Sequence, residues 1–83
     1  MRFSIVIPVY NRRSFLRSTI QSLLSEQIEN LEIIVVDDGS TDGSLSTIEN
    51  LPVKTLALSR NFGQSYAQNI GLKHAKGQWI TFL

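Results

Sequence analysis

Stretches of consecutive apolar residues recur along the chain, separated by segments with a helical pattern. The first two stretches, Phe3 to Val9 and Glu32 to Asp37, are rich in β-branched residues and predict strands buried on both faces. Shorter stretches at Val53 to Ser59 and Gln78 to Leu83 predict a third and a fourth strand.

Three helices are predicted between these strands, at Arg13 to Gln27, about Asp42 to Asn50, and Gly63 to Ala75. The first has apolar residues recurring at helical spacing. The second follows a polar turn that is typical of helix starts, and the third has Gly77 just past its end.

The alternating order of strands and helices predicts an α/β fold with a parallel sheet. With right-handed crossovers and the strand order 3-2-1-4, the first two helices cover one face and the third covers the other, which gives a three-layer, Rossmann-like arrangement. Ligands of such sheets bind where the strand order reverses, beyond the carboxyl ends of the strands. The residues to consider are therefore 8–12, 37–42 and 59–64.

Composition narrows the possible functions. The chain has 83 residues, a formal net charge of +1 and no cysteine. A nearly neutral chain gives no electrostatic reason to expect a nucleic acid partner. No apolar run approaches the roughly 20 residues of a membrane-spanning helix, and the lack of cysteine fits a reducing compartment.

Pro8 lies near the end of the first predicted strand, and Tyr10 directly follows that strand. Proline has no N–H and ends ladder pairing, which fixes the direction in which the chain leaves the sheet. A tyrosine at that point can stack on a flat base and donate a hydrogen bond, or it can simply cover the edge of the sheet. The sequence leaves both roles open.

Asp37 and Asp38 end the second predicted strand, where adjacent side chains point to opposite sides. One carboxylate can accept backbone N–H groups of the following turn, and the other can face the ligand crevice. Both could also be turn residues, as aspartate often is.

Arg60 and Gly63 stand at the start of the third predicted helix. A helix N-terminus with a glycine and a nearby arginine could bind a diphosphate, or Arg60 could be an exposed loop residue. The chain has neither a Walker A sequence nor a G-x-G-x-x-G sequence, so ATPase and dinucleotide chemistry are not supported.

Four segments in this order and spacing resemble the inverting family 2 glycosyltransferases: Ser4 to Asn11, Ile34 to Asp42, Arg60 to Gly63, and Ala67 to Gly77. The resemblance covers nearly the whole chain. It implies that residues 1–83 form the N-terminal nucleotide-binding part of a GT-A fold.

The resemblance also implies a nucleotide-diphosphate sugar as substrate. The family positions that match Pro8 and Tyr10 flank the base, and the one that matches Asp38 binds it, typically as uracil. Positions around Arg60 and Gly63 lie near the ribose and diphosphate. A Mg²⁺ or Mn²⁺ ion held by an Asp-x-Asp motif after the fourth strand stabilises the leaving group.

We expect the chain to stop before that motif, and therefore to bind metal poorly and to lack transferase activity by itself. A nucleotide-binding or structural module without catalysis is the alternative function. The exposed apolar fourth strand predicts self-association. Family 2 enzymes often make polysaccharide or glycolipid at the cytoplasmic face of a membrane, so we expect a cytoplasmic location, with any membrane association made through segments outside this chain.

Overall fold

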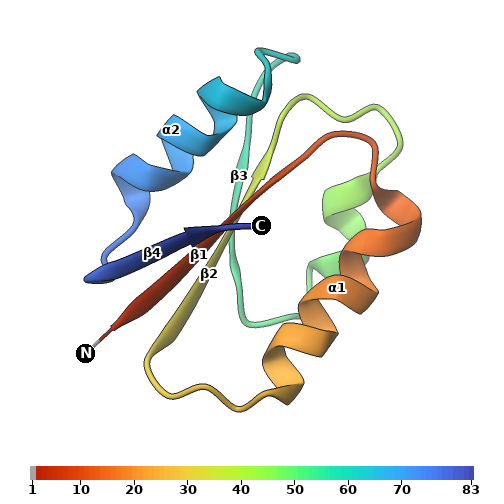
Figure 1. Cartoon of the computed structure of the whole chain (residues 1–83). Coiled ribbons are helices and arrows are strands. Elements are labelled where there is room, and N and C mark those ends of the chain that lie inside the picture. The colour runs from red at the N-terminus through yellow and green to blue at the C-terminus, as the bar shows by residue number, and fades with distance from the viewer. Residues whose placement is uncertain (1) are drawn as a thin grey trace.

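The computed structural model describes residues 2–83, and Figure 1 shows a sheet with helices on both sides. Strands and helices alternate along the whole chain. The elements are β1 (Phe3–Val9), α1 (Arg13–Ser25), β2 (Leu31–Asp37), the short 3₁₀ helix η1 (Ser44–Ile48), β3 (Lys54–Ala57), α2 (Gln64–His74) and β4 (Trp79–Phe82).

The four strands form one parallel sheet in the order β3-β2-β1-β4. In its centre, Val6 of β1 pairs with Ile34 of β2 and with Phe82 of β4. Both central strands begin and end within one residue of the predicted apolar stretches, because strands buried on both faces need continuous apolar sequence. The predicted α/β fold and strand order are confirmed.

Side chains of the central strands alternate between two cores. One core lies between the sheet and α1 with η1, and the other lies between the sheet and α2 (Figure 1). The buried members of the first are Ile7, Val9, Leu16, Ile20, Ile33, Val35 and Ile48, and those of the second are Val6, Ile34, Val36 and Ala67. The predicted three layers are therefore present.

The helix predicted at about residues 42–50 is shorter than expected. Only Ser44–Ile48 is helical, and it is a 3₁₀ helix. Asp42 accepts a hydrogen bond from the Ser44 N–H at 3.0 Å, and Gly43 between them has the left-handed φ of 76°. This local turn occupies the positions that would have formed the first helical turn.

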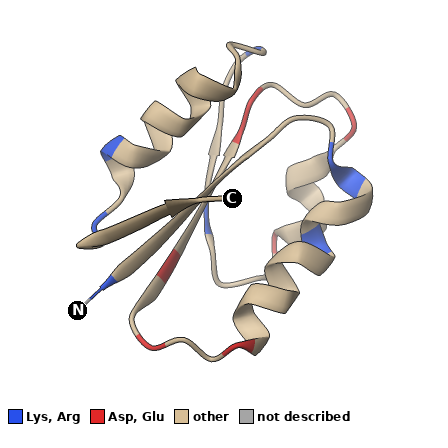
Figure 2. Cartoon of the chain, in the orientation of Figure 1, with Lys and Arg blue, Asp and Glu red and all other residues tan. Residues whose placement is uncertain are grey.

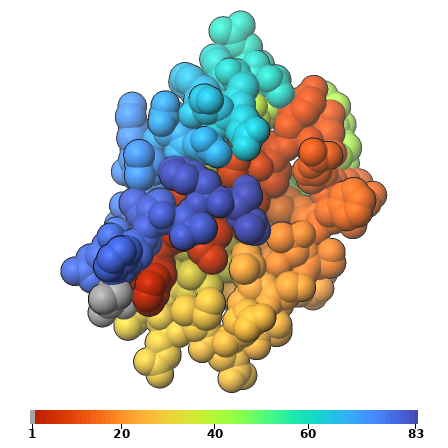
Figure 3. All heavy atoms as spheres, in the orientation of Figure 1, coloured from red at the N-terminus to blue at the C-terminus, as the bar shows by residue number. Residues whose placement is uncertain are grey.

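The strand β4 lies at an edge of the sheet. It pairs with β1 through its four residues, and Trp79 and Phe82 are 57% and 42% exposed. Figure 3 shows the dark-blue C-terminal residues on the surface beside the red residues of the N-terminal strand. An exposed edge strand of this kind is the feature on which the self-association prediction depends, and that prediction remains untested.

A buried carboxylate joins three segments at the amino ends of the strands. Glu32 lies within β2, where Figure 2 shows an acidic segment, and it is only 6% exposed. It accepts hydrogen bonds from the Ser4 hydroxyl at 2.8 Å, the Lys76 N–H at 2.9 Å and the Lys54 ammonium at 3.0 Å. The Ser4 hydroxyl in turn accepts the Gly77 N–H at 2.8 Å. The turn before β4 is thus attached to β1 and β2.

These contacts change the pKa of Glu32. Burial by itself raises the pKa, but the hydrogen bonds from Lys76, Lys54 and Ser4, with the positive charge of Lys54, outweigh burial and lower the pKa to about 2. Because the ordinary value is 4.5, the ionised carboxylate stabilises the folded state. This stabilisation is complete above pH 4.5 and is lost as the pH falls toward 2.

We therefore expect Glu32→Gln to lower the free energy of unfolding by on the order of 2 kcal/mol at pH 7, after allowance for solvent screening of the half-exposed Lys54. The difference from the unsubstituted chain should shrink as the pH falls from 4.5 toward 2. Urea unfolding followed by circular dichroism at several pH values measures it. Glu29→Gln, which changes an exposed carboxylate in the turn before β2, is the control. A Glu32→Gln effect that is constant over this pH range would contradict the role of the charge.

Candidate functional site

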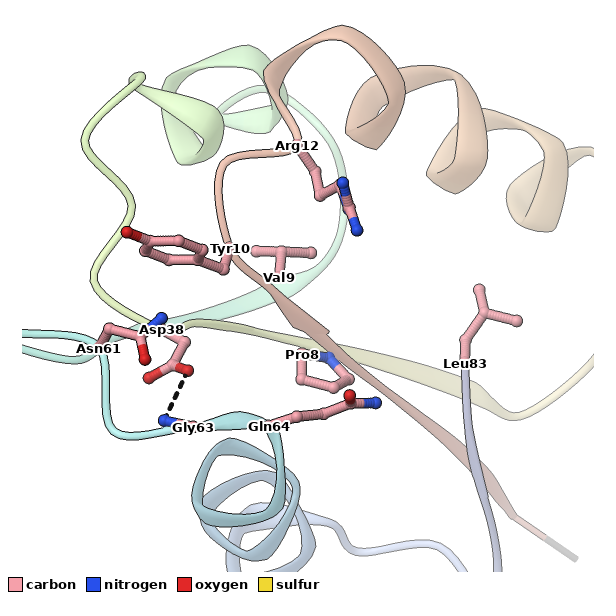
Figure 4. A pocket seen from close by; sticks show the side chains of 9 residues that line it. All are labelled: Pro8, Val9, Tyr10, Arg12, Asp38, Asn61, Gly63, Gln64 and Leu83. Carbon is pink, nitrogen blue, oxygen red and sulfur yellow. Dashed lines mark hydrogen bonds between the residues drawn. The ribbon is translucent and has the colours of Figure 1, made fainter.

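A cavity of about 410 Å³ lies at the carboxyl ends of the strands (Figure 4). Three loops surround it: β1–α1, β2–η1 and β3–α2. The lining residues are Pro8, Val9, Tyr10, Arg12, Asp38, Asn61, Gly63, Gln64 and Leu83. Its position between β1 and β4 is the point at which the strand order reverses, where ligands of such sheets bind.

Tyr10 and Asp38 lie in the same cavity although they follow different strands. The register of β1 with β2 explains this, because Val9 pairs with Asp37 and the next residue of each strand leaves the sheet at the same level. The Asp38 N–H donates to the Val9 carbonyl oxygen at 2.8 Å, which holds the two strand ends together. Tyr10 is 45% exposed, so its ring is available to a ligand.

The two adjacent aspartates have different roles. Asp37 Oδ1 accepts the Ser40 N–H at 3.2 Å, which is the turn-stabilising role considered for one member of the pair. Asp38, only 3% exposed, instead reaches the β3–α2 loop. Its Oδ1 accepts the Phe62 N–H at 2.7 Å and its Oδ2 accepts the Gly63 N–H at 3.0 Å. Asp38 therefore both lines the cavity and fixes the start of α2 (Figure 4).

Two glycines shape the loops around the cavity, one through its backbone conformation and one through a close contact. Gly63 precedes α2 with φ 103°, a conformation that other residues rarely adopt. A Cβ atom on Gly39 would lie 2.3 Å from the Arg60 carbonyl carbon. The β2–η1 and β3–α2 loops are therefore in backbone contact, and a side chain at Gly39 would separate them.

Four of the five residues that the sequence singles out line the cavity: Pro8, Tyr10, Asp38 and Gly63. Arg60 is not among the lining residues. Its guanidinium carbon lies 4.7 Å from the centre of the Phe62 ring, and that ring stacks on Tyr66 at 4.6 Å. The Arg60 guanidinium is therefore held by a cation–π contact within its own loop.

Arg12 is the cationic residue that lines the cavity. It stands at the N-cap position of α1, and its guanidinium makes no hydrogen bond or ion pair within residues 2–83. The residue range 8–12 was indicated by the strand order, but Arg12 itself was not selected. Its position in the loop directly after the first strand is the sequence feature from which a place in the cavity could have been predicted.

Within residues 2–83, no group of three or more His, Cys, Asp or Glu side chains could hold a metal ion. No helix in the same range has both the length and the apolar character that crossing a bilayer requires.

Several known proteins are similar to this chain in sequence and in fold. An uncharacterised glycosyltransferase of Haemophilus influenzae is 44% identical over 96% of this chain, which spans 34% of that protein. TarS 1–349 of S. aureus in complex with UDP-GlcNAc superimposes with a TM-score of 0.92 at 32% identity, over 100% of this chain and 26% of TarS 1–349.

A mannosyltransferase of Pyrobaculum calidifontis, solved in complex with GDP-Man and Mn²⁺, matches with a TM-score of 0.83 at 26% identity. The match covers 95% of this chain and 26% of that one. The structural neighbours are GT-A glycosyltransferase domains, which confirms the expected fold. In each of these three proteins the chain corresponds to about a third of the length or less.

The family model described as glycosyl transferase family 2 matches residues 4–83, nearly the whole length of the chain. The chain therefore belongs to glycosyl transferase family 2.

Proposed function

We propose that residues 1–83 bind the nucleotide part of a nucleotide-diphosphate sugar, within a longer enzyme that transfers the sugar to an acceptor hydroxyl with inversion. The observation that carries this proposal is the common cavity of Tyr10 and Asp38. One side chain offers an exposed aromatic face and the other offers a buried carboxylate, and the two lie where the strand order reverses.

In this proposal, the Tyr10 ring and the Asp38 carboxylate recognise the base of the nucleotide. The Tyr10 ring stacks on the base, a contact that contributes about 1–3 kcal/mol in proteins that bind single nucleotides of a strand. Each Asp38 oxygen accepts one backbone N–H and retains a second lone pair. An imide N–H, as in uracil, can donate to that lone pair.

A uridine-type donor is supported by the structure of TarS with UDP-GlcNAc. The complex of the Pyrobaculum enzyme with GDP-Man indicates that the same fold also accepts a guanine nucleotide. Because guanine also has a ring N–H that could donate to a carboxylate, the carboxylate alone does not select the base. We therefore propose uridine as the first nucleoside to test.

The diphosphate lies between Arg12 and the N-terminus of α2 in the proposal. Both line the cavity. Arg12 carries a positive charge, and the N-terminus of α2 offers backbone N–H groups and the positive end of the helix dipole. Arg60 can contribute only if it leaves the Phe62 ring. Pro8 lines the same cavity.

The described residues do not fit the metal ion that the proposed reaction uses. Among residues 2–83, Asp38 is the only side-chain carboxylate that lines the cavity, and no group of three or more His, Cys, Asp or Glu side chains in that range could hold a metal ion. We therefore place the ligands of a Mg²⁺ or Mn²⁺ ion, and the base that activates the acceptor, outside residues 2–83. A cytoplasmic location and any contact with a membrane stay predictions.

Nucleotide binding can be tested with two tyrosines of equal exposure. Tyr10 lines the cavity and Tyr66 does not, and both are 45% exposed. We expect UDP to shift the amide resonances of Tyr10, Asp38 and Gly63 in a saturable NMR titration. Tyr10→Ala should raise the Kd about tenfold because the stacking contact is lost, whereas Tyr66→Ala should leave it unchanged. Equal effects of the two substitutions, or shifts confined to another surface, would refute the site.

Asp38 should matter for the fold as well as for binding. In Asp38→Asn, the amide oxygen can accept only one of the two N–H groups of the β3–α2 loop, and the amide nitrogen faces the other donor. We expect a loss of about 2 kcal/mol in the free energy of unfolding. Asp37→Asn is the matched control, since its one hydrogen bond from Ser40 needs a single oxygen. Equal stability losses in urea unfolding would contradict the assigned roles.

The chain alone should not transfer sugar, because the metal ligands and the base are placed elsewhere. We expect no turnover of a UDP-sugar, with or without an acceptor, when Mn²⁺ is present. Release of UDP above the buffer rate, measured by a coupled assay, would show that residues 1–83 contain catalytic groups.

A further inference from the structure

The loop that carries Tyr10 is held by side chains of the β2–η1 loop. The Asn11 N–H donates to the Ser40 hydroxyl at 2.9 Å, and the Asn11 Oδ1 accepts the Thr41 N–H at 2.9 Å. These two bonds run in opposite directions between the same two loops. The residues that form these bonds lie near the surface. The two loops are therefore joined here by hydrogen bonds and not by packing of buried side chains.

The following residues continue the same connection. The Arg12 N–H donates to the Ser44 hydroxyl at 3.0 Å, and the Arg13 N–H donates to Asp42 Oδ2 at 3.1 Å. These are among the N–H groups that a helix start leaves without intrahelical partners. The N-cap residue of α1 makes no side-chain cap bond, so the β2–η1 loop caps α1 in its place.

Asn11 also turns the chain directly after Tyr10. Its φ is 52°, in the left-handed region that asparagine tolerates better than most residues. The Tyr10 hydroxyl makes no hydrogen bond to any of residues 2–83, and its ring is 45% exposed. The direction of the ring therefore depends on the backbone at Tyr10 and Asn11.

The opposite wall of the cavity belongs to the segment that Asn11 contacts. Asp38 precedes Ser40 and Thr41 by two and three residues and is itself fixed to the β3–α2 loop. The Asn11 bonds are the first connection after Tyr10 between its loop and this segment, so they restrain the separation of the Tyr10 ring from the Asp38 carboxylate. Without these bonds, the exposed loop could move the ring away while Asp38 stayed in place.

We propose that Asn11 is a positioning residue for nucleoside binding, which holds Tyr10 opposite Asp38 through its paired hydrogen bonds with Ser40 and Thr41. The proposal rests on the proposed function, since it assigns no ligand of its own. Asn11 does not line the cavity, so it acts on the ligand through Tyr10.

The test substitution is Asn11→Gly, which removes the Oδ1 acceptor and keeps a residue that adopts positive φ. Asn30→Gly is the matched control. Asn30 also has a positive φ, of 59°, but lies in the turn before β2, at the other end of the sheet. Asn11→Asp is the rescue variant, because its carboxylate oxygen can accept the Thr41 N–H. Uridine is the probe, since an uncharged ligand is insensitive to the added charge of this variant.

We expect Asn11→Gly to raise the Kd of uridine about fivefold, the loss associated with one hydrogen bond. Asn30→Gly should leave the Kd unchanged, and Asn11→Asp should restore it to within about twofold of the original value. The upfield shift of the uridine H5 and H6 resonances at saturation, caused by the stacked ring, should be smaller in Asn11→Gly. A loss of global stability alone would not change that shift.

If Asn11→Gly does not fold, Ser40→Ala removes the acceptor of the Asn11 N–H and should have the same effects.

Failure of this proposal can be distinguished from failure of the proposed function. Binding of uridine to the unsubstituted chain and to Asn11→Gly with the same Kd and the same shift would overturn the positioning role and leave the nucleotide site intact. If the unsubstituted chain binds neither uridine nor UDP, the proposed function fails. The contact itself is then judged by amide hydrogen exchange, where Asn11→Gly should accelerate exchange at Thr41 and Asn30→Gly should not. Unchanged exchange at Thr41 in Asn11→Gly would overturn the proposed role of Asn11.

Discussion

The two hydrogen bonds that the buried Asp38 carboxylate accepts from Phe62 and Gly63 determine the shape of the candidate site. They attach the end of β2, in the sheet, to the start of α2, in the helical layer packed on one face of that sheet. Gly39 permits this contact, because any side chain there would meet the backbone at Arg60. The cavity exists because two loops, far apart in the sequence, are held together at one point while the Tyr10 loop remains exposed beside them.

Two buried carboxylates, Glu32 and Asp38, lie near opposite ends of β2 and have different surroundings. At the amino ends, Glu32 is surrounded by donors from β1, β3 and the turn before β4, and every one of these contacts is internal. At the carboxyl ends, Asp38 uses one lone pair of each oxygen internally and keeps the other for a ligand in the proposed function. The two buried carboxylates, Glu32 within β2 and Asp38 directly after it, thus differ in whether their surroundings leave an acceptor free for a ligand.

The sequence was sufficient to predict the sheet and its order, since β1 and β2 are continuous apolar stretches and the helical segments alternate with them. It also indicated Pro8, Tyr10, Asp38 and Gly63, which all line the cavity. The shortened helix at Ser44 and the position of Arg60 could not be predicted in this way. The first depends on the Asp42 side chain and the left-handed Gly43, and the second on a contact with the Phe62 ring. The pattern of apolar residues does not show which of several local conformations a polar turn or a surface side chain adopts.

The nucleotide site is tested most directly by a crystal structure of the chain with UDP. We expect the uracil ring to lie against Tyr10 and its N3–H to be within hydrogen-bond distance of an Asp38 oxygen, with the phosphates directed toward Arg12 and the start of α2. A nucleotide bound at another surface, or one whose base contacts neither Tyr10 nor Asp38, would show that this cavity is not the nucleotide site.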